Sequence, residues 1–82
     1  MTEQIDQFFR SDGTLISIPI KSKKKIAVLN IISAKLAPNL TYSETQINEI
    51  ILNFHEDTAA IRRYMIEYRI LDRDNKSNYW LK

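Results

Sequence analysis

Residues 55–69 place the strongest constraint on the fold of this chain, because they separate into two faces when read at helical spacing. Apolar side chains recur at i, i+3, i+4 and i+7, as in a helix packed on a core. These side chains are Ile61, Tyr64, Met65 and Tyr68. The opposite face repeats the spacing with Ala59, Arg62, Arg63 and Ile66. Asp57 is a good N-cap, since its carboxylate can accept from the free N–H groups of the first turn. A short capped helix with outward arginines suits insertion into a nucleic-acid groove.

The composition limits the class of protein. Eighty-two residues predict one domain, residues 1–82, near the lower end of what a hydrophobic core can stabilise. With 44% hydrophobic residues the chain is too apolar for a disordered tail. It has no cysteine, which excludes disulfides and thiolate metal sites. No apolar run approaches the roughly 20 residues that cross a bilayer, and the acidic start is unlike a signal peptide. We therefore expect a cytoplasmic protein without a membrane partner.

Before residue 40 the pattern predicts a helix, a strand and a second helix. Ile5, Phe8 and Phe9 have the spacing of a short amphipathic helix that ends at the Asp12-Gly13 turn. Residues 14–18 are β-branched and apolar, which predicts a strand closed by Pro19. Ser22 can cap the next helix, which Pro38 stops. Its core positions are Ile26, Leu29, Ile32 and Leu36.

After residue 40 the pattern predicts two helices and a terminal hairpin. Ser43 opens the first with a capping box, because Gln46 lies at N3. Its apolar face consists of Ile47, Ile50, Ile51 and Phe54. A tight turn at residues 55–57 leads into the arginine helix, residues 57–70, and a hairpin follows at residues 71–82. Pairing of strand 14–18 with this hairpin would give an α+β winged helix, with a helix-turn-helix core and a small antiparallel sheet.

Several rare residue pairs occur in an order that resembles a bacterial domain of unknown function, number 2087. These residues are Phe8-Phe9, Asp12-Gly13, Ile18-Pro19, Lys21 to Lys25, Phe54-His55, Asp57, Arg62-Arg63, Glu67-Tyr68, Leu71-Asp72-Arg73 and Tyr79-Trp80. The resemblance spans nearly the whole chain. It implies a winged-helix-like domain of a kind often fused behind helix-turn-helix segments in transcriptional regulators.

Lysines cluster at the start of the second predicted helix, although the net charge of the chain is only +2. The cluster consists of Lys21, Lys23, Lys24 and Lys25. The helix macrodipole disfavours each cation at this position by about 0.3 kcal/mol or more. A phosphate partner would offset this, because each lysine contact releases condensed counterions. The alternative is an ordinary solvated face.

The two adjacent arginines also allow more than one interpretation. Arginine forks match both guanine edges and phosphates. Alternatively, Arg63 pairs with Glu67 one turn on, and Arg62 is buried against its own hairpin. Glu44 and Glu49 count against DNA, because the helix before a recognition helix usually crosses a phosphate backbone.

No residues suggest catalysis or a bound cofactor. His55 adjoins Glu56 and Asp57, but neighbouring residues seldom converge on one ion, so we expect a structural histidine bonded to a backbone group. Tyr79 and Trp80 could stack on bases, although closing the core is the more common role of such a pair. With no phosphate loop and no catalytic constellation, we expect neither an enzyme nor a cofactor or metal site.

The sequence thus predicts a small module that binds double-stranded DNA in transcriptional regulation. Residues 57–70 would be the recognition helix, and the 71–82 hairpin would be the wing. The predicted contacts are Lys21, Lys23, Lys24, Lys25, Thr58, Ala59, Arg62, Arg63 and Lys76. The alternative is a protein-interaction or dimerisation domain, with Ile66 and Ile70 on the partner surface.

Overall fold

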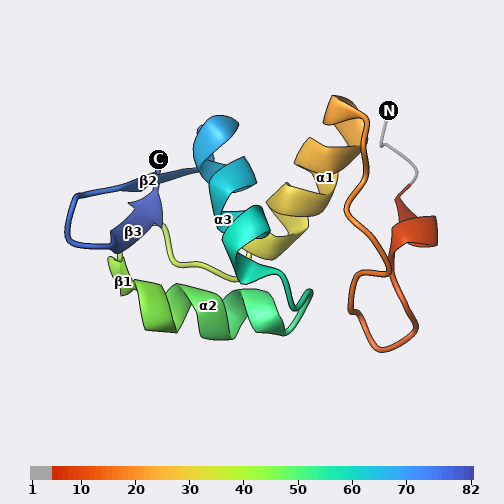
Figure 1. Ribbon diagram of the computed structural model, residues 1–82, viewed down its shortest axis with the longest axis horizontal. Coiled ribbons are helices and arrows are strands. Elements are labelled where there is room, and N and C mark those ends of the chain that lie inside the picture. Colours follow the sequence, from red (N-terminus) through yellow and green to blue (C-terminus); the bar gives the residue numbers. More distant parts are fainter. Residues whose placement is uncertain (1–4) are drawn as a thin grey trace.

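The computed structural model describes residues 5–82 of the chain and shows three helices with a small sheet. Its elements, in chain order, are η1 (Asp6–Phe8), α1 (Ser22–Ser33), β1 (Tyr42–Ser43), α2 (Glu44–Leu52), α3 (Thr58–Glu67), β2 (Leu71–Arg73) and β3 (Asn78–Leu81). The sheet lies at one end of the molecule and the segment before α1 at the other, with the helices between them (Figure 1). The predicted α+β class is confirmed.

The sheet has three antiparallel strands in the order β1-β3-β2. β2 and β3 form the predicted C-terminal hairpin, with Leu71 opposite Leu81. The third strand is β1, in which Tyr42 lies opposite Tyr79. The prediction that strand 14–18 completes the sheet is therefore wrong, because the residues just before α2 occupy that place.

The segment before α1 packs on the helices instead of joining the sheet. Leu15 is buried, and its backbone N–H donates to the carbonyl of Phe54 at 2.6 Å. A single isolated bridge pairs it with Phe9. The helix predicted over Ile5 to Phe9 is reduced to the short 3₁₀ turn η1. The turn at Gly13 is confirmed, with φ at +90°, which glycine adopts without strain.

Two of the three predicted helix caps are present. Ser43 and Gln46 form the full capping box of α2, with distances of 2.9 and 3.2 Å. The Asp57 carboxylate accepts from the N–H of Ala60 at 3.1 Å and caps α3. The prediction for Ser22 is wrong, since α1 begins without a side-chain cap and the Ser22 hydroxyl accepts from Tyr68 at 3.3 Å. α1 also ends at Ser33, before Pro38.

α3 ends at Glu67, three residues before the predicted end, in a Schellman motif. The N–H of Arg69 donates to the carbonyl of Ile66, and that of Ile70 donates to Met65. Arg69 adopts φ +60°, the left-handed conformation that this motif requires. The sequence shows no glycine at this position, so the stop was not visible in the pattern.

The core lies among the three helices and the inner face of the sheet. Its buried side chains are Leu15, Val28, Leu29, Ile32, Leu36, Ile47, Ile51, Phe54, Ile61, Met65, Leu71 and Tyr79. Eight of the twelve core positions predicted on the three helices are in this set, while Ile26, Ile50, Tyr64 and Tyr68 are half-buried. α1 thus buries Val28 beside Leu29, which turns Ile26 partly toward solvent.

Candidate nucleic-acid interface

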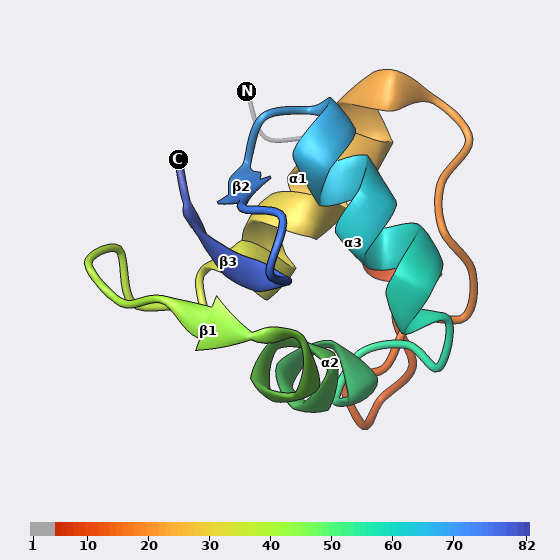
Figure 2. The ribbon, with the colours of Figure 1, turned by 60° about the vertical axis from the view of Figure 1, so that its left-hand side comes forward.

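α3 lies between α1 and the sheet and contacts both (Figure 1), and Figure 2 shows the domain with the sheet side turned forward. Residues 53–57 join it to α2, a longer connection than the three residues predicted. In this connection the Nδ1 atom of His55 accepts from the backbone N–H of Asp57 at 3.0 Å. The prediction of a structural histidine bonded to the backbone is confirmed.

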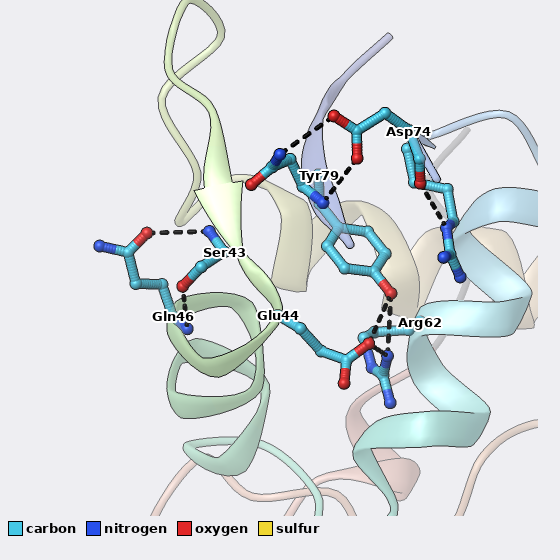
Figure 3. Close-up of polar contacts among 8 residues, drawn as sticks. Ser43, Glu44, Gln46, Arg62, Asp74 and Tyr79 are labelled. Carbon is cyan, nitrogen blue, oxygen red and sulfur yellow. Dashed lines mark hydrogen bonds and ion pairs between the residues drawn. The ribbon is translucent and has the colours of Figure 1, made fainter. Parts of the chain in front are cut away.

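Arg62 is held inside the domain by two other elements (Figure 3). Its Nη1 atom donates to Oε1 of Glu44 at 2.8 Å and to the hydroxyl of Tyr79 at 2.9 Å. That hydroxyl in turn donates to the same Glu44 oxygen at 3.1 Å. The three side chains form a triangle that connects α3 to the first turn of α2 and to β3.

This triangle places Arg62 against its own hairpin, which was one of the two interpretations of the sequence. The Arg62 side chain is 17% exposed and that of Glu44 is 44% exposed. Sequence spacing could not reveal the pair, because 18 residues separate the partners. The buried Nε atom of Arg62 has no hydrogen-bond partner among residues 5–82.

Arg63, the neighbouring residue, points to solvent and has different surroundings. Its Cζ atom lies 5.8 Å from the centroid of the Tyr64 ring. The Nζ atom of Lys25, from α1, lies 4.2 Å from the same centroid, a cation–π contact. The pair with Glu67, which was the alternative interpretation of Arg63, is not formed, since Arg62–Glu44 is the one ion pair of residues 5–82. Tyr64 therefore brings the start of α1 and the middle of α3 together.

A hollow of about 260 Å³ separates α3 from the hairpin. It is lined by Ala59, Arg62, Arg63, Ile66, Glu67, Arg73 and Tyr79. Arg73 was not among the predicted site residues. It lies opposite Tyr79 in the hairpin, with its Cζ atom 5.5 Å from that ring. The cross-strand position next to a core tyrosine could have drawn attention to it.

Three cations from three elements follow one another across this face, and we call them the basic strip: Lys25 of α1, Arg63 of α3 and Arg73 of β2. Tyr64 links the first two, and the hollow lies between the second and the third. Glu67 is an acid within the hollow, and Glu44 partly neutralises Arg62. The strip is therefore a mixed surface in which cations outnumber acids.

The other predicted contacts are dispersed. Lys24 and Lys21 line a different hollow, together with Phe8 and Ile18 of the segment before α1. Lys23 is exposed on the first turn of α1. The lysine cluster is thus divided, and Lys25 is the member that contacts Tyr64 of α3. At the start of α3, Ala59 is exposed and Thr58 half-buried.

Lys76 is exposed at the tip of the hairpin, which Asp74 organises. The Asp74 carboxylate accepts from the N–H of Lys76 at 2.9 Å and from both the backbone and the side-chain nitrogen of Asn78 at 3.0 Å. The side-chain bond from Asn78, followed by the backbone bonds, lowers the pKa of Asp74. Ser77 adopts φ +63°, as in a three-residue hairpin loop closed by a left-handed residue.

Tyr79 and Trp80 have separate environments. Tyr79 is buried in the core, as expected for a residue that closes it, whereas Trp80 is half-buried. Trp80 lines a hollow with Pro38 and Leu40, away from the basic strip. Tyr79 is therefore too buried to stack on a base, and Trp80 does not lie beside the basic strip.

The fold and this face define a small α+β domain with a mixed, mainly cationic surface built from α1, α3 and the hairpin. Residues 14–81 match the bacterial family described as uncharacterized proteins conserved in bacteria, DUF2087, and the chain belongs to that family. No curated protein and no solved structure matches the chain. Within residues 5–82, no helix is both long and apolar enough to span a membrane.

Proposed function

We propose that this domain binds double-stranded DNA as a small winged helix, in transcriptional regulation, with α3 as the recognition helix and the β2–β3 hairpin as the wing. The observation that carries the proposal is the basic strip, Lys25, Arg63 and Arg73, which runs from α1 across α3 to the hairpin. A run of cations on one face is the electrostatic footprint of phosphate binding.

The order of the elements supports the winged-helix assignment. α2 and α3 are adjacent helices with a short connection, as in a helix-turn-helix. β1 precedes this pair and joins the sheet beside β3, so the hairpin is anchored next to α3. A hairpin anchored in this way can contact DNA beside the helix that enters the groove.

Exposure suggests which side chains meet the DNA. Ala59 and Arg63 lie one turn apart on the exposed surface of α3, and the small Ala59 permits close approach to bases. Lys25 and Arg73 flank them and suit phosphate contacts. In this arrangement Arg63 is the candidate for reading a base edge, because arginine is the commonest partner of guanine.

The proposal is tested by binding to a fluorescently labelled duplex over a salt series. We expect the affinity to fall steeply with salt. Changing Lys25, Arg63 or Arg73 to glutamine should each reduce the slope of log affinity against log salt concentration by about one, because one fewer counterion is released. Lys35→Gln is the matched control, because Lys35 is exposed near Phe9 and Ile31, away from the strip. If the wild type shows no salt-dependent binding, or if Lys35→Gln has the same effect, the proposal is wrong.

A second candidate function is self-association, favoured by exposed apolar side chains at the other end of the molecule. Ile16 and Leu52, each 54% exposed, line a hollow with Phe54 where α2 ends, away from the hairpin (Figure 1). Ile66 and Ile70, which the sequence suggested for a partner surface, are instead half-buried against the core. The partner surface of this candidate is therefore the Ile16–Leu52 hollow.

The occupant of that hollow would be a second copy of the chain. Arg10 and Glu56 line the same hollow with opposite charges. In a dimer with its two-fold axis between these residues, Arg10 of each copy would lie beside Glu56 of the other copy. The surface would then be self-complementary. Sedimentation equilibrium should show a dimer that Leu52→Glu dissociates and Leu40→Glu, at a site 53% exposed, leaves intact. A monomer at all concentrations would exclude this candidate.

A further inference from the structure

Arg62 lines the proposed DNA-binding face, yet the domain does not satisfy all of its donors. Nη1 donates to both Glu44 and Tyr79, while the buried Nε atom has no partner in the described part of the chain. An unpaired buried N–H group is unfavourable, and the guanidinium offers five donors in a fork. The side chain also borders the hollow that contains Arg63 and Arg73. A new partner for the Nε–H group would therefore stabilise Arg62, and the adjoining hollow gives the side chain room to move.

The Glu44 carboxylate has stabilising interactions other than the ion pair with Arg62. It is the first residue of α2, where the macrodipole favours a carboxylate. Its side chain is 44% exposed, so water can replace the arginine. The hydroxyl of Tyr79 also remains as a donor to the same oxygen. Loss of the Arg62 contact should therefore cost Glu44 little free energy.

We propose that Arg62 is a gated phosphate contact: Glu44 holds it in the free domain, and on DNA binding its guanidinium exchanges Glu44 for a backbone phosphate. The inference rests on the proposed function. A phosphate presents paired oxygens to the arginine fork, so it can satisfy Nε and a terminal nitrogen together. Glu44 is then an internal competitor, and its charge lowers the affinity of the domain for DNA.

Competition through one residue predicts coupling between two substitutions. Glu44→Gln keeps the shape of the side chain but removes its charge. We expect it to tighten binding to a labelled duplex about three- to tenfold at low salt, as the release of one partly exposed pair allows. In an Arg62→Gln background the same change should have an effect of less than about twofold, because no arginine is then released.

The four proteins of this cycle are compared with one control. Glu49→Gln removes an exposed acid from the same helix, so it measures the general effect of a less negative α2. If Glu44→Gln and Glu49→Gln tighten binding equally, or if Glu44→Gln is as effective without Arg62, the exchange is wrong. Melting of each variant is followed in parallel. Arg62→Met, which keeps the aliphatic stem but removes the charge, replaces Arg62→Gln if the latter is unfolded.

A direct observation of Arg62 completes the test. The Nε–H resonance of Arg62 should shift when duplex is titrated into the wild-type domain, and it should remain in place in Lys25→Gln at salt high enough to prevent binding. No shift in a domain that does bind DNA would refute the exchange alone. If the wild type does not bind duplex at any salt concentration, the proposed function fails and the exchange fails with it.

Discussion

The hydroxyl of Tyr79 accepts a hydrogen bond from Arg62 at 2.9 Å, and this contact fixes the hairpin against α3. The Tyr79 ring is buried, so its position is set by the core, and the Arg62 guanidinium lies 5.8 Å from the ring centroid. The hollow that separates α3 from the hairpin therefore has a defined width in the free domain. The hairpin side of the proposed DNA-binding surface is thus formed in the free domain, and the proposed exchange changes only the Glu44 contact of Arg62.

Removing this hydroxyl should destabilise the domain modestly. Tyr79→Phe keeps the ring in the core but takes one partner each from Arg62 and Glu44, and we expect it to lower the free energy of unfolding by about 1 kcal/mol. Urea denaturation measures the change. Tyr64→Phe is the matched control, because the Tyr64 hydroxyl makes no hydrogen bond within residues 5–82. Equal effects of the two substitutions would show that the triangle contributes nothing.

The features that the sequence predicted correctly are those encoded by neighbouring residues. The Ser43–Gln46 capping box, the Asp57 cap and the polar tip of the hairpin each depend on residues within five positions of one another. The third strand was assigned wrongly because long-range packing, not neighbouring residues, decides which segment pairs with β3. β1 has only two residues, too few to show a period of two, while residues 14–18 show that period and pack on the helices.

The left-handed end of α3 offers a stabilising substitution. Arg69 adopts φ +60°, which costs a residue with a Cβ atom about 1 kcal/mol or more relative to glycine. Arg69→Gly should therefore raise the free energy of unfolding by about 0.5–1 kcal/mol after the entropy cost of glycine is subtracted. Arg63→Gly, inside α3, should instead lower it by about 1 kcal/mol. A loss of stability in Arg69→Gly would mean that its side chain has a role that its exposure does not reveal.

Asp74 should make the stability of the hairpin depend on acid. Hydrogen bonds from Asn78 and Lys76 hold the pKa of Asp74 below its ordinary value in the folded state. Asp74 therefore stabilises the fold above the unfolded pKa of about 3.9, and this contribution is lost as the pH falls through the lower, folded value. Denaturation midpoints from pH 6 down to about pH 2 should fall more for the wild type than for Asp74→Asn. Parallel curves for the two proteins would refute the assignment.

The candidate site was only partly predictable, for the same reason as the sheet. Sequence periodicity placed Arg62 and Arg63 together on the outside of a helix, which is correct for Arg63. The partners of Arg62 come from α2 and β3, and no spacing rule connects those segments to α3. Lys25 was named as one of four equivalent lysines, and only the fold shows that it alone contacts Tyr64.

Adjacent arginines with opposite surroundings allow the structural and binding roles to be separated by one pair of variants. Arg62→Ala should lower the free energy of unfolding by about 1–3 kcal/mol, because it removes charge-assisted hydrogen bonds to Glu44 and Tyr79. Arg63→Ala should change it by less than about 0.5 kcal/mol, as is usual for an exposed side chain. Thermal melting measures both.

The same two variants should differ again in binding to duplex DNA. Arg63→Ala should weaken the preference for one sequence by about 1–3 kcal/mol if its fork reads a base edge. Arg62→Ala should weaken binding to all sequences alike, since a phosphate carries no sequence information. Competition between labelled specific and random duplexes distinguishes the two patterns. If Arg63→Ala instead weakens all duplexes equally, α3 does not read the groove through Arg63, and the basic strip binds only the DNA backbone.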